Sequence, residues 1–230
     1  MTFKGIIFDF NGVLWWDTAL QEEAWQQFVT ELRGTPFSAE EMAIHIHGRT
    51  NQHTLEYVTG RALAGAELEE LLQRKETIYR RLCLAQGSAF CLSPGAIPLL
   101  DFLVEHAIPH TIATASEKTN VAFFIQHLDL ARWFDPALIV MDNGVRPGKP
   151  APDIYLQAAQ NLGLAPGECV VVEDSHSGIA AAHAAGIGHI IALGPTSAHE
   201  VLRQRAGVQR VIENLGQLPT EIFFSKLNQL

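Results

Sequence analysis

Residues 6–14 read Ile6-Ile7-Phe8-Asp9-Phe10-Asn11-Gly12-Val13-Leu14, and this stretch decides the fold. Its apolar residues have the character of a buried strand, which ends in a carboxylate and a glycine turn. An ionised Asp is costly to bury and is usually there for chemistry, so we expect Asp9 to stay exposed at the end of the strand. Ligands of open α/β sheets sit outside the carboxyl ends of the strands. The stretch therefore predicts a site at Asp9, with Asn11 standing where a second acid would be expected.

The composition allows a sizeable buried core and argues against a nucleic-acid partner, while a phosphorylated small molecule could still bind. The chain has 230 residues, of which 47% are hydrophobic, and 16 Lys and Arg against 25 Asp and Glu give a formal charge of −9. Nucleic-acid binding needs a basic footprint, which argues against that class of partner. No apolar run approaches the ~20 residues of a membrane span, and no signal peptide is recognised. Cys83, Cys91 and Cys169 lack metal-ligand spacing and are read as reduced packing residues, so we expect a cytoplasmic protein. We also expect a monomer or a weak dimer.

The pattern of elements divides the chain into two parts. A strand is expected at 4–10. Only helical patterns follow it: at 19–32, in a second helix that begins with a capping box at Ser38, at 50–58 and at 67–85. Strands are then expected at 110–114, 137–141, 169–172, 189–193 and 208–212, alternating with helices that end near 106, 127, 162, 185 and 205 and with a terminal helix from Pro219. Alternation of this kind implies a parallel sheet covered on both faces. We therefore predict an α/β fold: a doubly wound parallel-sheet (Rossmann-like) core of residues 1–16 and 88–230, with an inserted all-helical cap domain of residues 17–87.

Four short signals stand at strand ends or turns, where a site of such a fold would form. They are Asp9 with Asn11, Thr114 with Ala115 and Ser116, Gly148-Lys149-Pro150, and Glu173-Asp174-Ser175. Mg²⁺ prefers oxygen ligands, which Asp9, Asp174 and Glu173 could supply, and a carboxylate beside Mg²⁺ can attack phosphorus. Lys149, the Thr114 hydroxyl and backbone amides of Ala115 and Ser116 could hold phosphoryl oxygens. Taken singly, each signal is as well explained by a turn or a helix cap, for which Ser116 is a candidate; the combination is far more specific.

The same residues carry a resemblance to a known family. The chain resembles the haloacid dehalogenase-like (HAD) superfamily, in the branch with a small helical cap that includes beta-phosphoglucomutase-like and phosphatase-like members. The resemblance rests on 8–14, on Ala113-Thr114-Ala115-Ser116, on Gly148-Lys149-Pro150-Ala151-Pro152-Asp153, and on Val172-Glu173-Asp174-Ser175 with Gly178. It implies that Asp9 is the nucleophile and a Mg²⁺ ligand, that the backbone carbonyl of Asn11 and the side chains of Asp174 and Glu173 complete the metal site, and that Thr114, Ala115 and Lys149 bind phosphate.

Asn11 departs from the family pattern, because phosphatases of the family usually carry an Asp there as the general acid and base. An Asn can donate a hydrogen bond but cannot shuttle a proton. Three interpretations stay open: a slow or specialised hydrolase, a protein that binds phosphate without turning it over, and an engineered substitution.

The cap also bears on the substrate. Arg49, in a segment that resembles the cap of beta-phosphoglucomutase-like members, could reach a distal anionic group of the substrate, or it could be a solvated loop arginine. Sugar-phosphate mutases of the family use a His on the first cap helix, where this chain has Gln21 and Glu22, which weakens a mutase assignment. We predict a Mg²⁺-dependent hydrolase of a small phosphomonoester, such as a sugar phosphate, that acts through an aspartyl phosphate on Asp9. The alternatives are a phosphometabolite-binding protein with little turnover and a phosphosugar mutase.

Overall fold

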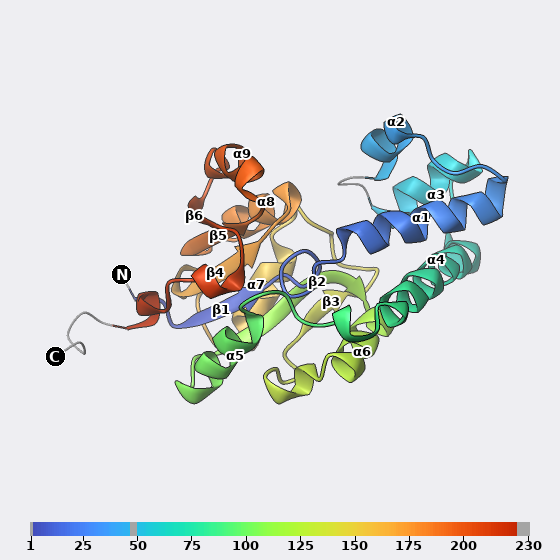
Figure 1. Ribbon diagram of the computed structural model, residues 1–230. Helices are drawn as coiled ribbons and strands as arrows, with labels where there is room; N and C mark the ends of the chain where they lie inside the picture. Colours follow the sequence, from blue (N-terminus) through green and yellow to red (C-terminus); the bar gives the residue numbers. More distant parts are fainter. Residues whose placement is uncertain (1, 47–49, 225–230) are drawn as a thin grey trace. The chain divides into compact units, whose positions relative to one another are not determined.

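The computed structural model describes residues 2–46 and 50–224 (Figure 1). The chain divides into two compact units. The core unit comprises Met1–Trp16 and Cys91–Leu230, and the helical unit comprises Asp17–Phe90. That these units are separate folding domains, with the boundaries 1–16 with 88–230 and 17–87, stays a prediction.

A parallel sheet forms the centre of the core unit. Within the described residues its strands are β1 (Gly5–Phe8), β2 (His110–Glu117), β3 (Val140–Asp142), β4 (Cys169–Glu173), β5 (His189–Leu193) and β6 (Val208–Ile212). Their order is β3-β2-β1-β4-β5-β6, and every neighbouring pair is parallel. The central strands β1 and β4 are buried along their whole length, which explains their continuous apolar sequences. The predicted doubly wound α/β fold class is confirmed.

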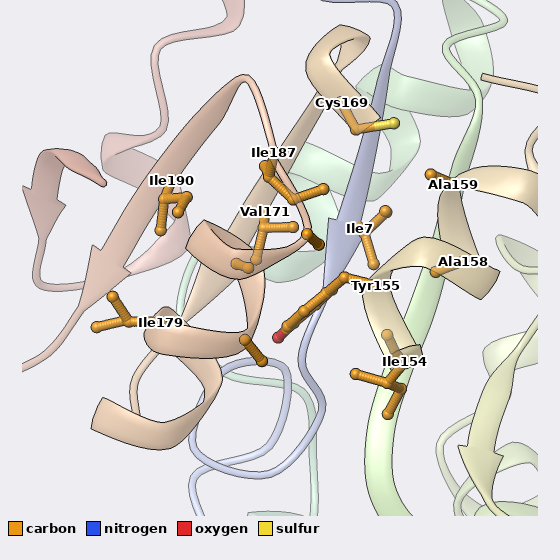
Figure 2. Close-up of a cluster of buried hydrophobic side chains, with 14 of the residues drawn as sticks. Ile7, Ile154, Tyr155, Ala158, Ala159, Cys169, Val171, Ile179, Ile187 and Ile190 are labelled. Carbon is orange, nitrogen blue, oxygen red and sulfur yellow. The ribbon is translucent and has the colours of Figure 1, made fainter. Parts of the chain in front are cut away.

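Helices cover both faces of this sheet. They are α5 (Ala96–Glu105), α6 (Lys118–His127), α7 (Asp153–Asn161), α8 (His176–Ala184) and α9 (His199–Arg203). The order of strands reverses direction after β3, so right-handed crossovers place α5 and α6 on one face and α7, α8 and α9 on the other. Figure 2 shows the apolar cluster that these helices form with the sheet, which includes Tyr155 of α7, Ile179 of α8, and Ile7 and Val171 of the two central strands.

The helical unit consists of two long helices with shorter helical segments between them in the sequence. It contains α1 (Thr18–Arg33), α2 (Ala39–Glu41), a π-helical turn (Met42–Ile46), α3 (Asn51–Thr59) and α4 (Gly65–Ala85). Helices α1 and α4 pack together, and the side chains they bury include Trp25, Phe28 and Tyr79. The capping box predicted from Ser38 is present, since its side chain accepts from Glu41 N and the Glu41 side chain accepts from Ser38 N.

Two features of the core unit differ from the sequence expectation. Strand β2 continues to Glu117, so Ser116 lies in the strand and the N-cap of α6 is Glu117, whose carboxylate accepts from Thr119 N. The expected terminal helix from Pro219 is, as far as the described residues extend, a 3-10 turn at Thr220–Phe223. At the end of β2, Ser116 and Glu117 have the chemistry of helix caps, and pairing of Glu117 with Asp142 of β3 favours the strand.

Hydrogen bonds within the core unit join the segment before the helical unit to the segment after it. Ser93 N donates to Leu14 O at 2.8 Å, and Ser93 Oγ donates to Val13 O at 2.6 Å. Ser93 is buried, so both hydrogen bonds are shielded from water. No helix among the described residues has the length and apolar character that a membrane span requires.

Candidate active site

The register of the sheet gathers the chemical residues at one edge. Phe8 lies level with Ile112 of β2 and with Val172 of β4, so the residues that follow these three positions share the carboxyl edge of the sheet. Asp9 is fixed there by its amide, which donates to Val172 O at 3.0 Å. Asp9 is only 7% exposed, so the expectation that the glycine turn leaves it open to solvent is wrong. The ammonium of Lys149 offsets part of the solvation that the carboxylate loses on burial, and a raised pKa reflects the part that it does not offset.

Three carboxylates converge at this edge. Asp9, Glu173 and Asp174 each place one carboxylate oxygen within 4.8 Å of the others. Glu173 is completely buried. Their close approach depends on Gly12, whose φ is +83° and where an added Cβ would lie 2.0 Å from Asp174 Oδ2. The glycine of the turn is thus needed both for its backbone conformation and for the space that Asp174 fills.

Lys149 lies between two of these acids. Its Nζ donates to Asp9 Oδ1 at 2.9 Å and to Glu173 Oε1 at 2.6 Å, and its side chain is nearly buried. Lys149 stands in the turn that precedes α7, and Asp9 directly follows β1, so this contact joins two segments that are 140 residues apart in the chain. The ring of Tyr155 lies 5.2 Å from the ammonium, within the range of a cation–π contact.

Glu173 is held by donors from α7, from Lys149 and from the start of α8. Its Oε1 accepts from Lys149 and from the Tyr155 hydroxyl at 3.0 Å, and its Oε2 accepts from Ser175 N at 2.7 Å and Ser175 Oγ at 3.0 Å. A Cβ added at Gly178 would lie 1.5 Å from Oε1. Glu173 thus belongs to the acidic cluster, but it could bind an ion only by giving up one of these hydrogen bonds.

The electrostatics of the cluster favour a cation. Burial raises the pKa of Asp9 from 3.8 to about 7, with Lys149 acting against this shift and Glu173 adding to it. Burial, reinforced by the charges of Glu173 and Asp9, raises the pKa of Asp174 well above its usual value. Burial acts to lower the pKa of Lys149, but Asp9 and Glu173 outweigh it and raise this pKa well above its usual value. One ammonium does not balance three carboxylates, and a divalent ion would remove the remaining repulsion.

The residues after β1 and along β2 form the other wall of the site. Thr114 is buried and its Oγ1 accepts from Ser116 N at 3.0 Å, while Ala115 is exposed. Ser116 Oγ donates to Asn11 Oδ1 at 2.7 Å, a link of 105 residues that fixes the orientation of the amide. Sequence reasoning missed this link because it treated Ser116 as a helix cap.

The predicted site residues are therefore brought together in the core unit. Asp9, Glu173, Asp174 and Lys149 form one charged cluster, and Asn11 is joined to Ser116 beside Thr114. Arg49, predicted to reach the substrate, lies outside the described residues. Tyr155 and Ser175 were not singled out by the sequence as partners of Glu173, and only the strand–turn–helix context of Ser175 gave a signal, as a helix cap.

The donor set suits Mg²⁺. Three carboxylate oxygens lie within 4.8 Å of one another, and burial together with the neighbouring negative charges raises the pKa values of Asp9 and Asp174. A hard divalent cation would relieve this repulsion. Asp9, Asp174 and the backbone carbonyl of Asn11 would hold such an ion, with Glu173 adjacent.

Comparisons with known proteins agree with this architecture. The haloacid dehalogenase-like hydrolase family matches residues 3–186. Hexitol phosphatase A of Escherichia coli is 34% identical over 193 residues, covering 84% of this chain and 84% of that protein. Beta-phosphoglucomutase of Bacillus subtilis is 29% identical over 231 residues, covering 98% and 96%.

A solved structure of a HAD hydrolase has the same fold as this chain. The crystal structure of a HAD hydrolase, family IA, variant 3, from Entamoeba histolytica superposes with a TM-score of 0.89 at 34% identity, covering 96% of this chain and 97% of that one. The matched region contains β1 and Asp9 that follows it, the turn with Lys149 and the acidic end of β4. The chain therefore belongs to the haloacid dehalogenase-like hydrolases, as the resemblance of its motifs implied.

Proposed function

We propose that this protein hydrolyses a small phosphomonoester, such as a sugar phosphate, with Mg²⁺ and through an aspartyl phosphate on Asp9. The observation that carries the proposal is the convergence of Asp9, Asp174 and Lys149 at one edge of the sheet. This arrangement offers a nucleophile, a cation site and a fixed positive charge within one small volume. The relatedness to a hexitol phosphatase supports a phosphorylated carbohydrate as the substrate class.

The first step is attack of an Asp9 carboxylate oxygen on phosphorus. An O–P bond forms between Asp9 and phosphorus, and the bond from phosphorus to the ester oxygen breaks. The leaving oxygen takes its proton from a water molecule, because the Asn11 amide cannot give one up. Lys149 binds Asp9 Oδ1, so it orients the carboxylate and places positive charge beside the phosphoryl oxygens, where negative charge accumulates. A bound Mg²⁺ would neutralise phosphoryl charge in the same place.

The second step is attack of water on the aspartyl phosphate, which releases inorganic phosphate and restores Asp9. A general base at this point is typically worth ~10²–10⁴-fold. Asn11 stands in the position of that base, and its amide oxygen already accepts from Ser116 Oγ. Asn11 can orient a water or donate to a leaving oxygen, but it cannot remove a proton. We therefore infer slow turnover, limited by loss of the phosphoryl group from Asp9.

The test is phosphate release from a panel of sugar and nucleotide phosphates in Mg²⁺, run on this chain, Asn11→Asp and Asp9→Ala side by side. We expect slow phosphate release by this chain and a rate of release ~10²–10⁴-fold higher in Asn11→Asp. Asp9→Ala should release no phosphate. Rapid quenching and intact-mass measurement would detect an adduct of one phosphoryl group on this chain and not on Asp9→Ala. Absence of release from all variants would exclude the phosphatase.

A second candidate is a phosphometabolite-binding protein with little turnover, which the fixed amide of Asn11 favours. It predicts thermal stabilisation by phosphorylated ligands in Mg²⁺ without phosphate release, even in Asn11→Asp. A mutase is the third candidate, favoured by the full-length similarity to beta-phosphoglucomutase. Gln21 argues against it, because its side chain accepts from Lys75 Nζ and donates to Asp17 and does not titrate. Isomerisation assays on hexose phosphates separate a mutase from both other candidates.

A further inference from the structure

Tyr155 is a polar residue that the proposed chemistry does not use. It lies on α7, is completely buried, and has its ring inside the apolar cluster with Ile7 and Val171 (Figure 2). Its hydroxyl leaves this apolar surrounding and donates to Glu173 Oε1 at 3.0 Å. A phenol is an unusual choice for a packing position, because a buried hydroxyl needs a partner where phenylalanine needs none.

The partner it has found is a carboxylate with no access to solvent. Each oxygen of Glu173 takes two donors, Lys149 and Tyr155 on Oε1, and the amide and hydroxyl of Ser175 on Oε2. A carboxylate has about four lone-pair directions, so these donors fix both its position and its rotation. Burial, and then the charge of Glu173, raise the pKa of Tyr155 well above its usual value, so the phenol remains a donor throughout the working pH range.

The same tyrosine contacts the other member of this pair. Its ring lies 5.2 Å from Lys149 Nζ. An ammonium has three N–H donors, and in the described part of the chain two of them go to Asp9 and Glu173. The direction of the third is then set by the two carboxylates and by the ring beneath the ammonium.

We propose that Tyr155 is a positioning residue: its hydroxyl locks the Glu173 carboxylate and its ring supports Lys149, so that the lysine presents its remaining donor to the phosphoryl group. This inference rests on the proposed function and deepens it, since it names what orients the phosphate-binding cation. Tyr155 is buried beneath the charged cluster and acts through Glu173 and Lys149. Groups that orient a ligand-binding residue in this way are typically worth 10–100-fold in affinity or activity.

The test uses Tyr155→Phe in the full-length chain, which keeps the ring and deletes the hydroxyl. Thr111→Val is the matched control: Thr111 is buried in the same sheet and its hydroxyl donates to Leu138 O at 2.9 Å, away from the cluster. Both variants lose one buried hydroxyl hydrogen bond, so a comparable drop in melting temperature is expected. A purely structural role for Tyr155 would move only that temperature.

The deciding readouts are the dissociation constant for inorganic phosphate in Mg²⁺, by calorimetry, and the separate values of kcat and KM for the best phosphomonoester. Tyr155→Phe is expected to weaken phosphate binding and kcat/KM by about 10–100-fold, whereas Thr111→Val leaves both near the unsubstituted values. Phosphate affinity and kcat/KM unchanged in Tyr155→Phe would overturn the inference while leaving the phosphatase intact. If the unsubstituted chain neither binds phosphate nor releases it from any substrate, the proposed function itself fails, and with it this inference.

Discussion

Magnesium binding should depend steeply on pH, because the ion must displace a proton from Asp9. The pKa of this carboxyl is raised from 3.8 to about 7 by burial, with Glu173 contributing. At pH 5 about 99% of Asp9 is therefore protonated, and removing the proton costs about 2.7 kcal/mol. The apparent affinity for Mg²⁺ is expected to be ~100-fold weaker at pH 5 than at pH 8, and the raised pKa of Asp174 would make the dependence steeper.

The measurement is isothermal titration with MgCl₂ at pH 5, 6, 7 and 8. Two buffers of different ionisation enthalpy at pH 6 would count the protons released, and about one or more is expected. Asp101→Asn is a matched control, since this carboxylate is partly exposed and pairs with Arg132 away from the cluster. Affinity that changes less than threefold between pH 5 and 8, with no proton release, would refute the reasoning.

The raised pKa of Asp9 also predicts how the free energy of unfolding changes with pH when no metal is bound. The folded state holds a proton on Asp9 between pH 4 and 7 that the unfolded chain has lost. The free energy of unfolding should therefore fall as pH rises through this window, by about 1.4 kcal/mol per pH unit for one such group. Urea unfolding in EDTA at pH 5 and pH 7 measures this, and saturating Mg²⁺ should reduce or reverse the trend.

Three further substitutions test the packing described above. Gly178→Ala places a methyl group against Glu173 and is expected to cost roughly 1–3 kcal/mol in urea unfolding and to abolish phosphate binding, whereas Gly148→Ala meets no atom within 4 Å and should leave stability unchanged. Lys75→Met removes the buried ammonium 3.0 Å from Glu76 Oε1 and should lower the free energy of unfolding by about 3–5 kcal/mol. The additional change Glu76→Gln should restore most of this loss, and no recovery in the double variant would contradict an ionic origin. Ser38→Ala deletes one half of the capping box and should lower stability by about 1 kcal/mol, with no change in phosphate affinity.

The fold was readable from the sequence wherever burial on both faces dictated the residues. Strands β1, β4 and β5 are apolar apart from Glu173 at the end of β4 and His189 at the start of β5. The alternation of such runs with helices left few topologies open. Strand β2 was harder, because its last residues are Ser116 and Glu117, which have the chemistry of helix caps. Pairing of Glu117 with Asp142 in β3 decided that segment, and no local pattern encodes such a pair.

The site was predictable in its members and less so in their contacts. Asp9, Lys149 and Asp174 carry chemical types that stand out after strands or in turns. The burial of Asp9 and the four hydrogen bonds of Glu173 depend on residues that look like packing or capping positions in the sequence, above all Tyr155 and Ser175. A single sequence records which groups are present, whereas the pairing of buried charges is settled by distances between segments far apart in the chain.

The two hydrogen bonds from Ser93 to Val13 and Leu14 bear on whether residues 17–90 could be exchanged. They join the two segments of the core unit close to the points where the chain leaves that unit at residue 16 and returns to it at residue 91. Neither the acids of the charged cluster nor Lys149 belongs to residues 17–90, so we expect that this stretch could be exchanged while the charged cluster keeps its geometry. Chimaeras joined at residues 16 and 91 that still bind phosphate would support this expectation.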